Sequence, residues 1–443
     1  MIRDPAVIVI GAGMAGLAAA CQLGHAGLPV DIIEARDRIG GRVLTHVLPG
    51  GHGASELGAE FIHGKPPEIW EPLRKAGAHI SEVQGDAWCV EDRHLTPCGF
   101  WEDVDEILGK MDDSKPDESF AAFLDRCCPS PKTQAKRRAR QHAQEYVSGF
   151  NAADPALVGV HWLVEEMRAE EKIQGDRAFR SHHGYKDLLD VLKRELDEYK
   201  VRIQMQAVAQ EVRWSSGRAT VRIRQSDEVK TIDAQRVLIT LPLSLLKAPV
   251  GQSGAIQFTP ELPREKKQAL DKLEMGKVIR VTLRFRERFW DVIKPVAGRS
   301  LANMSFLFTE DDWFPTWWTA NPEKTPMITG WAPFRSAERL SGKNRSFVVE
   351  RALETLRVKL GVAPHDLQSI LDDEHYHDWQ TDPFSLGAYS YGKVGANAAL
   401  QELATPTENT LYFAGEATDT TGHNGTVHGA IASGHRAAMQ ILS

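Results

Sequence analysis

The sequence predicts an α/β fold built on a parallel sheet, and three features near its start carry the prediction. Residues 7–10 are an unbroken run of valine and isoleucine, as in a strand buried on both faces. The glycine pattern 11-13-16 follows, and an alanine-rich stretch at 17–26 has the composition of a helix. Residues 30–33 form a second strand that ends in Glu34. Together these features predict one strand–helix–strand unit.

The spacing of the glycines indicates a Rossmann-type dinucleotide site. Gly11 allows a tight turn, Gly13 lets the backbone approach a pyrophosphate, and Gly16 permits close packing of helix and strand. The N–H groups and the positive dipole end of the helix would face that pyrophosphate. Glu34 stands where a carboxylate accepts hydrogen bonds from an adenosine ribose. A purely structural turn is the alternative, and the complete unit argues against it.

The residues after Glu34 narrow the dinucleotide to FAD. They match the pattern E-x-R-x-x-x-G-G-R, which resembles the continuation found in FAD-binding flavoproteins. Arg36 and Arg42 would supply positive charge beside the diphosphate, and glycines 40 and 41 would bring backbone amides against it. The alternative is a surface turn with two solvated arginines.

Composition sets limits on the rest of the molecule. A chain of 443 residues is longer than one hydrophobic core usually supports, so we expect two domains. The net charge of −7 gives no indication of nucleic-acid binding, and no apolar run approaches the ~20 residues of a membrane span. The glycine pattern starts so early that we expect no signal peptide. Five cysteines without CxxC spacing predict free thiols in a cytoplasmic protein.

The remaining elements alternate between two units. A turn at 50–53, a helix at 66–77 and a hairpin within 80–100 come first, followed by charged helices over 101–180 whose charges we expect to be solvated. A helix at 185–199 and strands up to 240 return to the first unit. A second sheet is predicted from strands at 277–285, 313–318 and 327–331, and a helix follows at 345–360. The chain ends with a strand at 409–416 and a helix at 425–442. The predicted FAD-binding domain is therefore 1–79, 186–248 and 395–443, and the substrate domain is 80–185 and 249–394 with a helical lid.

Several segments resemble the flavin amine oxidase family of monoamine oxidases, polyamine and spermine oxidases and lysine-specific histone demethylases. They are the N-terminal motif and the segments 237–247, 382–391, 411–416 and 425–434. The segments 56–64 and 426–430 are closer to the polyamine oxidase and demethylase branch. The resemblance implies an amine-oxidase-like fold, in which an α+β substrate domain is interleaved with the FAD domain.

The motif and the resemblance together assign the cofactor contacts. Glu416 is expected at the ribityl-diphosphate region, Val208 at the adenine, and Thr426 and Val427 at the helix that faces the flavin. Trp379 matches a tryptophan packed beside the flavin, although a core tryptophan needs no such role. The full expected cofactor set is Gly11, Gly13, Met14, Ala15, Gly16, Glu34, Ala35, Arg36, Gly41, Arg42, Val43, Gly58, Ala59, Glu60, Phe61, Val208, Gly415, Glu416, Thr426 and Val427.

The chain departs from the family pattern in two places. Monoamine oxidases bind FAD through a cysteine, but no cysteine follows Cys128, so we expect non-covalent FAD. The family also carries a lysine that is bridged by water to flavin N5, and here the matching position is Arg280. Lys277 is an odd number of residues away and would point to the opposite face, unless a bulge turns it inward.

The substrate wall is the least defined part of the site. The candidates for an aromatic cage are Tyr391 and the run Trp313, Trp317 and Trp318. His423 and Thr426 stand where relatives often have aromatic residues. His63 matches a histidine of animal polyamine oxidases, or else is a polar turn residue. We expect no metal ligands.

The predicted function is FAD-dependent oxidation of an amine C–N bond to an imine. A hydride equivalent passes from the amine to flavin N5, the imine is hydrolysed, and oxygen or another acceptor takes the electrons. A flavin desaturase or porphyrinogen-type oxidase is one alternative, and a non-catalytic FAD-holding interaction protein is another. The sequence names neither the amine nor the oligomeric state.

Overall fold

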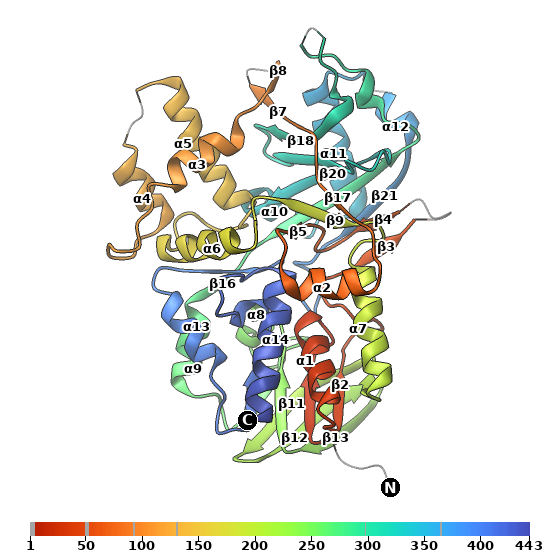
Figure 1. Ribbon diagram of the computed structural model, residues 1–443, viewed down its shortest axis with the longest axis vertical. Coiled ribbons are helices and arrows are strands. Elements are labelled where there is room, and N and C mark those ends of the chain that lie inside the picture. The colour runs from red at the N-terminus through yellow and green to blue at the C-terminus, as the bar shows by residue number, and fades with distance from the viewer. Residues whose placement is uncertain (1–4, 49–52, 92–93, 130–131, 297, 364–365) are drawn as a thin grey trace.

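The computed structural model describes residues 5–48, 53–91, 94–129, 132–296, 298–363 and 366–443. The chain forms two units stacked along the long axis of the molecule, with the C-terminal helix in the lower unit of the view (Figure 1). The turn expected at 50–53 lies, apart from Gly53, outside the described residues.

The lower unit is built on a five-stranded parallel sheet in the order β10-β2-β1-β14-β23. Its strands are β1 (Val7–Ile10), β2 (Val30–Ile33), β10 (Arg202–Gln204), β14 (Arg236–Ile239) and β23 (Leu411–Phe413). The helix α1 (Met14–His25) connects β1 to β2, which pair in parallel. From β1 the chain continues to β2 on one side, and from β14 it continues to β23 on the other side. This change of direction opens a crevice at the carboxyl end of β1.

Alternate residues of β1 pack into two different layers. Val7 and Val9 pack with the helices α1, α2 (Pro67–Lys75), α7 (Lys186–Glu198) and α14 (Val427–Leu442). Ile8 and Ile10 pack against a second sheet in the order β13-β12-β11-β15. Its strands are β11 (Ala207–Ser215), β12 (Arg218–Gln225), β13 (Glu228–Ala234) and β15 (Gln257–Thr259). Since β15 pairs with β11, this layer extends beyond the boundary expected at 248.

The upper unit contains a seven-stranded sheet in the order β21-β17-β20-β19-β18-β7-β8. The strands are β7 (Asp86–Glu91), β8 (His94–Pro97), β17 (Val278–Phe285), β18 (Met304–Thr309), β19 (Thr316–Thr319), β20 (Met327–Pro333) and β21 (Leu371–His377). Residues of α11 (Arg345–Leu360) share a core with this sheet, and α10 (Phe334–Leu340) and α12 (Asp366–Ile370) flank it. The hairpin expected within 80–100 is β7–β8, and it joins this sheet.

The charged helices lie beside this sheet and the lower unit (Figure 1). They are α3 (Phe100–Leu108), α4 (Phe120–Cys127), α5 (Gln134–Gly149) and α6 (Val160–Lys172). Their charges are not simply solvated as expected, because acids and bases from different helices and loops pair. The ion pairs are Asp103–Arg138, Asp125–Arg140 and Asp113–Arg168. No helix of the described residues is long and apolar enough to cross a membrane.

Short elements complete the two units. They are β3 (Thr45–Val47), β4 (Ala54–Glu56), β5 (Ile62–His63), β6 (Ile80–Glu82), β9 (Ala178–Ser181), α8 (Leu243–Lys247), α9 (Arg264–Asp271), β16 (Leu273–Met275), η2 (Phe289–Val292), η3 (Leu301–Asn303), β22 (Ser390–Gly392), α13 (Asn397–Ala404) and η4 (Glu416–Thr418).

The prediction that all five cysteines are free thiols is wrong for two of them. Cys89 lies on β7 and Cys98 directly follows β8, and a disulfide joins them with their Cα atoms 5.1 Å apart. The hairpin brings both residues together, which the spacing alone did not indicate. Cys21, Cys127 and Cys128 are free.

Candidate active site

A cavity of about 1190 Å³ lies between the two units. Its lining comes from the carboxyl edge of the parallel sheet, from the seven-stranded sheet and from α5 and α6. Pockets for one small molecule usually measure about 300–1,000 Å³, so this cavity has room for a dinucleotide and a smaller ligand.

The three glycines of the N-terminal motif occupy different surroundings at the edge of this cavity. Gly11 has a φ of +106°, and a Cβ there would lie 2.7 Å from Thr240 Oγ1. A Cβ on Gly16 would lie 2.0 Å from the carbonyl oxygen of Gly11, so helix α1 needs glycine to pack against β1. A Cβ on Gly13 would meet nothing within 4 Å, and Gly13 lines the cavity. This geometry leaves the N-terminus of α1 open to an anionic group and fits a diphosphate.

Glu34 is buried at the carboxyl end of β2, and backbone groups hold its carboxylate. Its Oε2 accepts a hydrogen bond from the Ala12 N–H at 2.7 Å, and its Oε1 accepts one from the Arg36 N–H at 2.8 Å. Each oxygen keeps a further lone pair, which a ribose hydroxyl could use. The start of β11 lies alongside, because the Ala207 N–H donates to the Glu34 carbonyl at 2.8 Å and Val208 lines the cavity.

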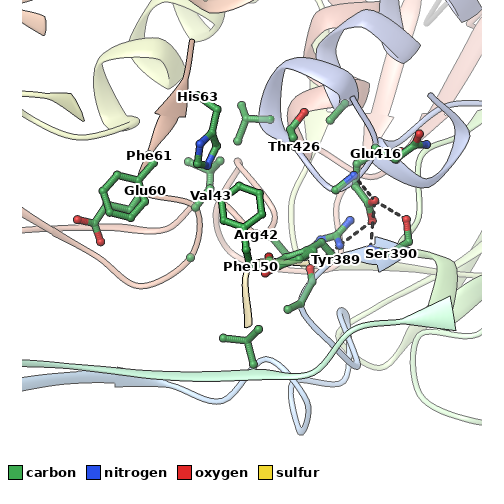
Figure 2. Close-up of a pocket in the computed structure, with 18 of the residues that line it drawn as sticks. Arg42, Val43, Glu60, Phe61, His63, Phe150, Tyr389, Ser390, Glu416 and Thr426 are labelled. Carbon is green, nitrogen blue, oxygen red and sulfur yellow. Dashed lines mark hydrogen bonds and ion pairs between the residues drawn. The ribbon is translucent and has the colours of Figure 1, made fainter. Parts of the chain in front are cut away.

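Glu416 links three segments that are far apart in the chain (Figure 2). Its carboxylate pairs with Arg42 at 2.9 Å and accepts hydrogen bonds from Ser390 Oγ at 2.6 Å and from the Gly425 N–H at 3.0 Å. Arg42 also donates to the Ala388 carbonyl at 2.6 Å. The loop before α14 is thereby fixed at the cavity wall.

The helix α14 begins at this wall. Thr426 is its N-cap, and the Thr426 Oγ1 accepts from the Gly429 N–H at 3.0 Å. Thr426 and Val427 both line the cavity, so the positive end of the helix dipole is directed at it.

A buried charge network surrounds Glu60 on the opposite side of the cavity. Arg180 Nε and Arg280 Nη2 each donate to its carboxylate at 2.7 Å, and Trp318 Nε1 donates at 3.1 Å. Arg280 also donates to the Gly58 carbonyl at 3.0 Å. Burial would raise the pKa of Glu60, but the two guanidinium groups outweigh it, and the pKa lies below its usual range.

The strand β17 separates the two candidates for the lysine position. Arg280 is 3% exposed and lines the cavity. Lys277 precedes the strand, and its Nζ pairs with Glu338 at 2.9 Å on the outer surface. The ladder from Val278 to Arg284 pairs with β20 without a bulge, so nothing in it turns Lys277 inward.

The expected aromatic cage is only partly present. Trp317 does not belong to it, because successive residues of β19 point to opposite faces and Trp317 is fully buried in the core of the upper unit. Trp318 and Tyr391 line the cavity. Trp379 lines it too, and its Nε1 donates to the Leu57 carbonyl at 2.7 Å.

The wall on the helical side carries carboxylates and neutral histidines. Glu166 on α6 accepts two hydrogen bonds from Asn151 Nδ2, at 2.8 and 2.9 Å. Burial and the nearby Glu170 raise the pKa of Glu166 to about 8. Burial lowers the pKa of His63, which lies edge-on to Phe150 with ring centroids 5.2 Å apart.

Most of the predicted site residues share this one cavity. Gly16 serves packing, Lys277 and Trp317 point away, and His423 packs behind the cavity wall against His428. The remaining predicted residues line the cavity: Gly11, Gly13, Met14, Ala15, Glu34, Ala35, Arg36, Gly41, Arg42, Val43, Gly58, Ala59, Glu60, Phe61, His63, Val208, Arg280, Trp318, Trp379, Tyr391, Gly415, Glu416, Thr426 and Val427.

A family model described as "Flavin containing amine oxidoreductase" matches residues 14–95 and 105–442. The chain belongs to this family. The match covers both units and most of the cavity lining, and the fold class predicted from the sequence is confirmed.

Curated relatives of this chain fall into two groups. Lysine-specific histone demethylase 1 homolog 1 of Arabidopsis thaliana is 26% identical over all of this chain and 52% of its own length. Probable polyamine oxidase 4 of Arabidopsis thaliana is 28% identical over 98% of this chain and 86% of its own length. The chain thus spans about half of the demethylase relative and most of the polyamine oxidase.

Solved structures share the fold of this chain. A putrescine oxidase bound to putrescine superposes with a TM-score of 0.80 at 20% identity, covering 99% of both chains. Cyclohexylamine oxidase from Brevibacterium oxydans has a TM-score of 0.76, also at 20% identity and 99% coverage of both chains.

Sequence reasoning missed residues that the fold brings to the cavity from the helical region. Arg180, Glu166 and Phe150 lie in segments that read as solvated lid helices. Phe179 and Arg180 are neighbours on β9, so their side chains point to opposite faces of the strand. This alternation was the one local signal available for Arg180. Nothing local marked Glu166, because acids precede and follow it on the same helix.

Proposed function

We propose that this chain is an FAD-dependent amine oxidoreductase that holds FAD without a covalent bond and oxidises an amine to an imine, which water then hydrolyses. The observation that supports it most is the continuity of one cavity, from the open cradle at Gly13 to the carboxyl group of Glu166. Such a cavity can place a nucleotide cofactor and a cationic small molecule side by side.

The residues of the lower unit fit FAD. Glu34 would hold the ribose, the cradle of Gly13 and Gly41 with Arg42 would hold the diphosphate, and the N-terminus of α14 would face the ring system. When bound, the flavin supplies a two-electron acceptor for the C–H bond next to the amine nitrogen.

The opposite wall fits an amine. A reacting amine must be neutral at the nitrogen that loses electrons. His63 and His428 have lowered pKa values, which favours uncharged rings that would not repel an ammonium group elsewhere on the substrate. Aromatic rings from Phe61, Phe150 and Trp318 offer faces for an alkyl chain or a cation. Glu166 would pair with an ammonium group elsewhere on the substrate, which would draw the proton off its carboxyl.

The experiment is anaerobic mixing of the purified yellow protein with a panel of monoamines, diamines and polyamines, followed by flavin absorbance. We expect bleaching, at lower concentrations for diamines and polyamines than for monoamines. Glu166→Gln should raise the half-saturating diamine concentration about tenfold, since a hydrogen-bonded charge pair contributes about 1.5–3 kcal/mol. Glu165→Gln, at an exposed neighbour on α6, is the matched control. If no amine bleached the flavin, the proposed activity would be rejected.

A further inference from the structure

One histidine of the loop before α14 and one of its first turn meet a carboxylate of α6 at the edge of the cavity. They are His423, His428 and Glu170. We propose that these three side chains form a binding site for a divalent transition-metal ion of the zinc type, whose remaining coordination positions face the cavity.

The three side chains already converge. One ligand atom from each lies within 4.8 Å of the others, and His423 Nδ1 is 3.8 Å from Glu170 Oε1. The two imidazole rings pack edge to face with centroids 4.6 Å apart. Zinc binds histidine nitrogen and carboxylate oxygen at about 2.0–2.2 Å, which places tetrahedral ligand atoms about 3.3 Å apart. Rotations of the side chains that move each atom by about 1 Å would close the site.

Nitrogen atoms of both histidines are left unsatisfied. His428 is 3% exposed, and its Nε2 has no hydrogen-bond partner among the residues that the structure describes; His423 Nδ1 is likewise buried without one. A buried polar group without a partner costs about 1–3 kcal/mol, and a metal ion would satisfy both nitrogens at once.

The backbone around the three ligands is fixed in advance. The His423 N–H donates to Asp419 Oδ2 at 3.0 Å, and the His423 carbonyl accepts from Thr426 Oγ1 at 2.6 Å. Gly422 has a φ of +90°, and a Cβ there would lie 2.8 Å from the Cβ of Ala169, so this loop packs directly on α6 beside Glu170. Such supporting contacts orient metal ligands and strengthen binding.

A second glycine makes room for the carboxylate. A Cβ on Gly175 would lie 1.8 Å from Glu170 Oε2, so any larger residue there would displace the acid from the histidines. Both Glu170 and His428 line the cavity, and Glu170 lies close enough to His63 to influence its pKa. An ion at this point would therefore stand next to bound amine and compete with it.

Equilibrium dialysis of the untagged holoenzyme against Zn²⁺, with metal and flavin measured in the same sample, tests the site. We expect one Zn²⁺ per chain, with the affinity lowered at least about tenfold by Glu170→Gln and by His423→Gln while flavin content is retained. The matched control is His182→Gln, in an exposed histidine group where His182 Nδ1 lies 3.5 Å from Glu323 and its ring lies beside His183. This variant should bind zinc as the native chain does.

Two results of the dialysis would overturn the zinc site. Absence of stoichiometric zinc would reject the site. Zinc lost in His182→Gln but kept in the other two variants would assign the binding to the surface. A steady-state assay tests whether the ion lies at the edge of the cavity. Zn²⁺ should raise the apparent KM for the amine, and a chelator should restore the original KM. Zinc that bound without changing KM would contradict its position at the cavity edge.

Discussion

Arg280 distinguishes this chain from the family pattern. Its positive charge is already paired with a carboxylate of the protein before any ligand binds. Its guanidinium is held by Glu60 and the Gly58 carbonyl, and Glu60 is shared with Arg180 and Trp318. A lysine has a single ammonium on a flexible stem and could not reproduce this planar set of donors. Position 280 therefore combines a permanent positive charge with a fixed direction.

Replacing Arg280 by lysine separates the two halves of the catalytic cycle. We expect reduction by amine to change by less than about threefold, and reoxidation by oxygen to rise about tenfold, because a mobile ammonium can order water near the reacting centre. Stopped-flow absorbance measures both rates. Arg284→Lys is the matched control, on the same strand but paired with Asp372 outside the cavity. If Lys277→Met alone abolished the oxygen reaction, the assignment of Arg280 would be wrong.

Removing the charge of Glu60 should destabilise the fold. Glu60→Gln leaves two buried guanidinium groups without a counter-ion, and breaking a buried pair in this way costs about 3–5 kcal/mol. Glu82→Gln breaks a half-exposed pair with Arg177 and should cost less than about 1 kcal/mol. Denaturant unfolding gives both free energies, and equal losses would refute the burial argument.

At the scale of one element, α1 depends on two glycines for different reasons. Gly16→Ala places a methyl group 2.0 Å from the Gly11 carbonyl and should lower both Tm and flavin content. Gly13→Ala meets no protein atom within 4 Å and has an ordinary φ of −76°, so Tm without flavin should stay within about 1 °C of the native value. Its flavin content should still fall, because the methyl group would occupy the phosphate cradle. Thermal unfolding of flavin-free protein and flavin absorbance test the distinction.

The helix α6 should make stability depend on pH through Glu166. Its pKa is raised from 4.5 to about 8, so the folded state holds this proton more tightly than the unfolded state does. The stabilisation is complete below the unfolded pKa and is lost as pH rises through the folded one. Glu166→Gln cannot ionise, so its Tm advantage over the native chain should grow by about 2 °C between about pH 5 and about pH 8.5. A constant difference would contradict the raised pKa.

For the whole molecule, the positions of the cysteines bear on how FAD is held. Cys89 and Cys98 are bonded to each other, Cys21 is buried in α1, and Cys127 and Cys128 lie at the end of α4. None of the five lines the cavity as the structure describes it. Acid precipitation should therefore release all of the flavin into the supernatant. Flavin that stayed with the precipitate would show a covalent bond.

Local patterns were enough to predict the lower unit and much of its site. The valine and isoleucine run, the three glycines and Glu34 act through neighbours a few residues away, so their spacing carries the geometry. The face of β17 also followed from its period of two, which separates Arg280 from Lys277. The same rule shows that the neighbours Trp317 and Trp318 cannot both face the cavity, and only the structure decided which one does.

The tertiary structure alone decided how the opposite wall is assembled. Glu60 meets Arg180 and Arg280, and Glu170 meets His423, across separations along the chain that no local pattern encodes. The disulfide between Cys89 and Cys98 likewise depends on the pairing of β7 with β8. The sequence by itself determined the family, the fold class and the cradle for the nucleotide, because those rest on backbone conformation and short-range packing. Long-range packing decides which charges are neutralised. It also decides which histidine nitrogens lack a hydrogen-bond partner among the residues that the structure describes.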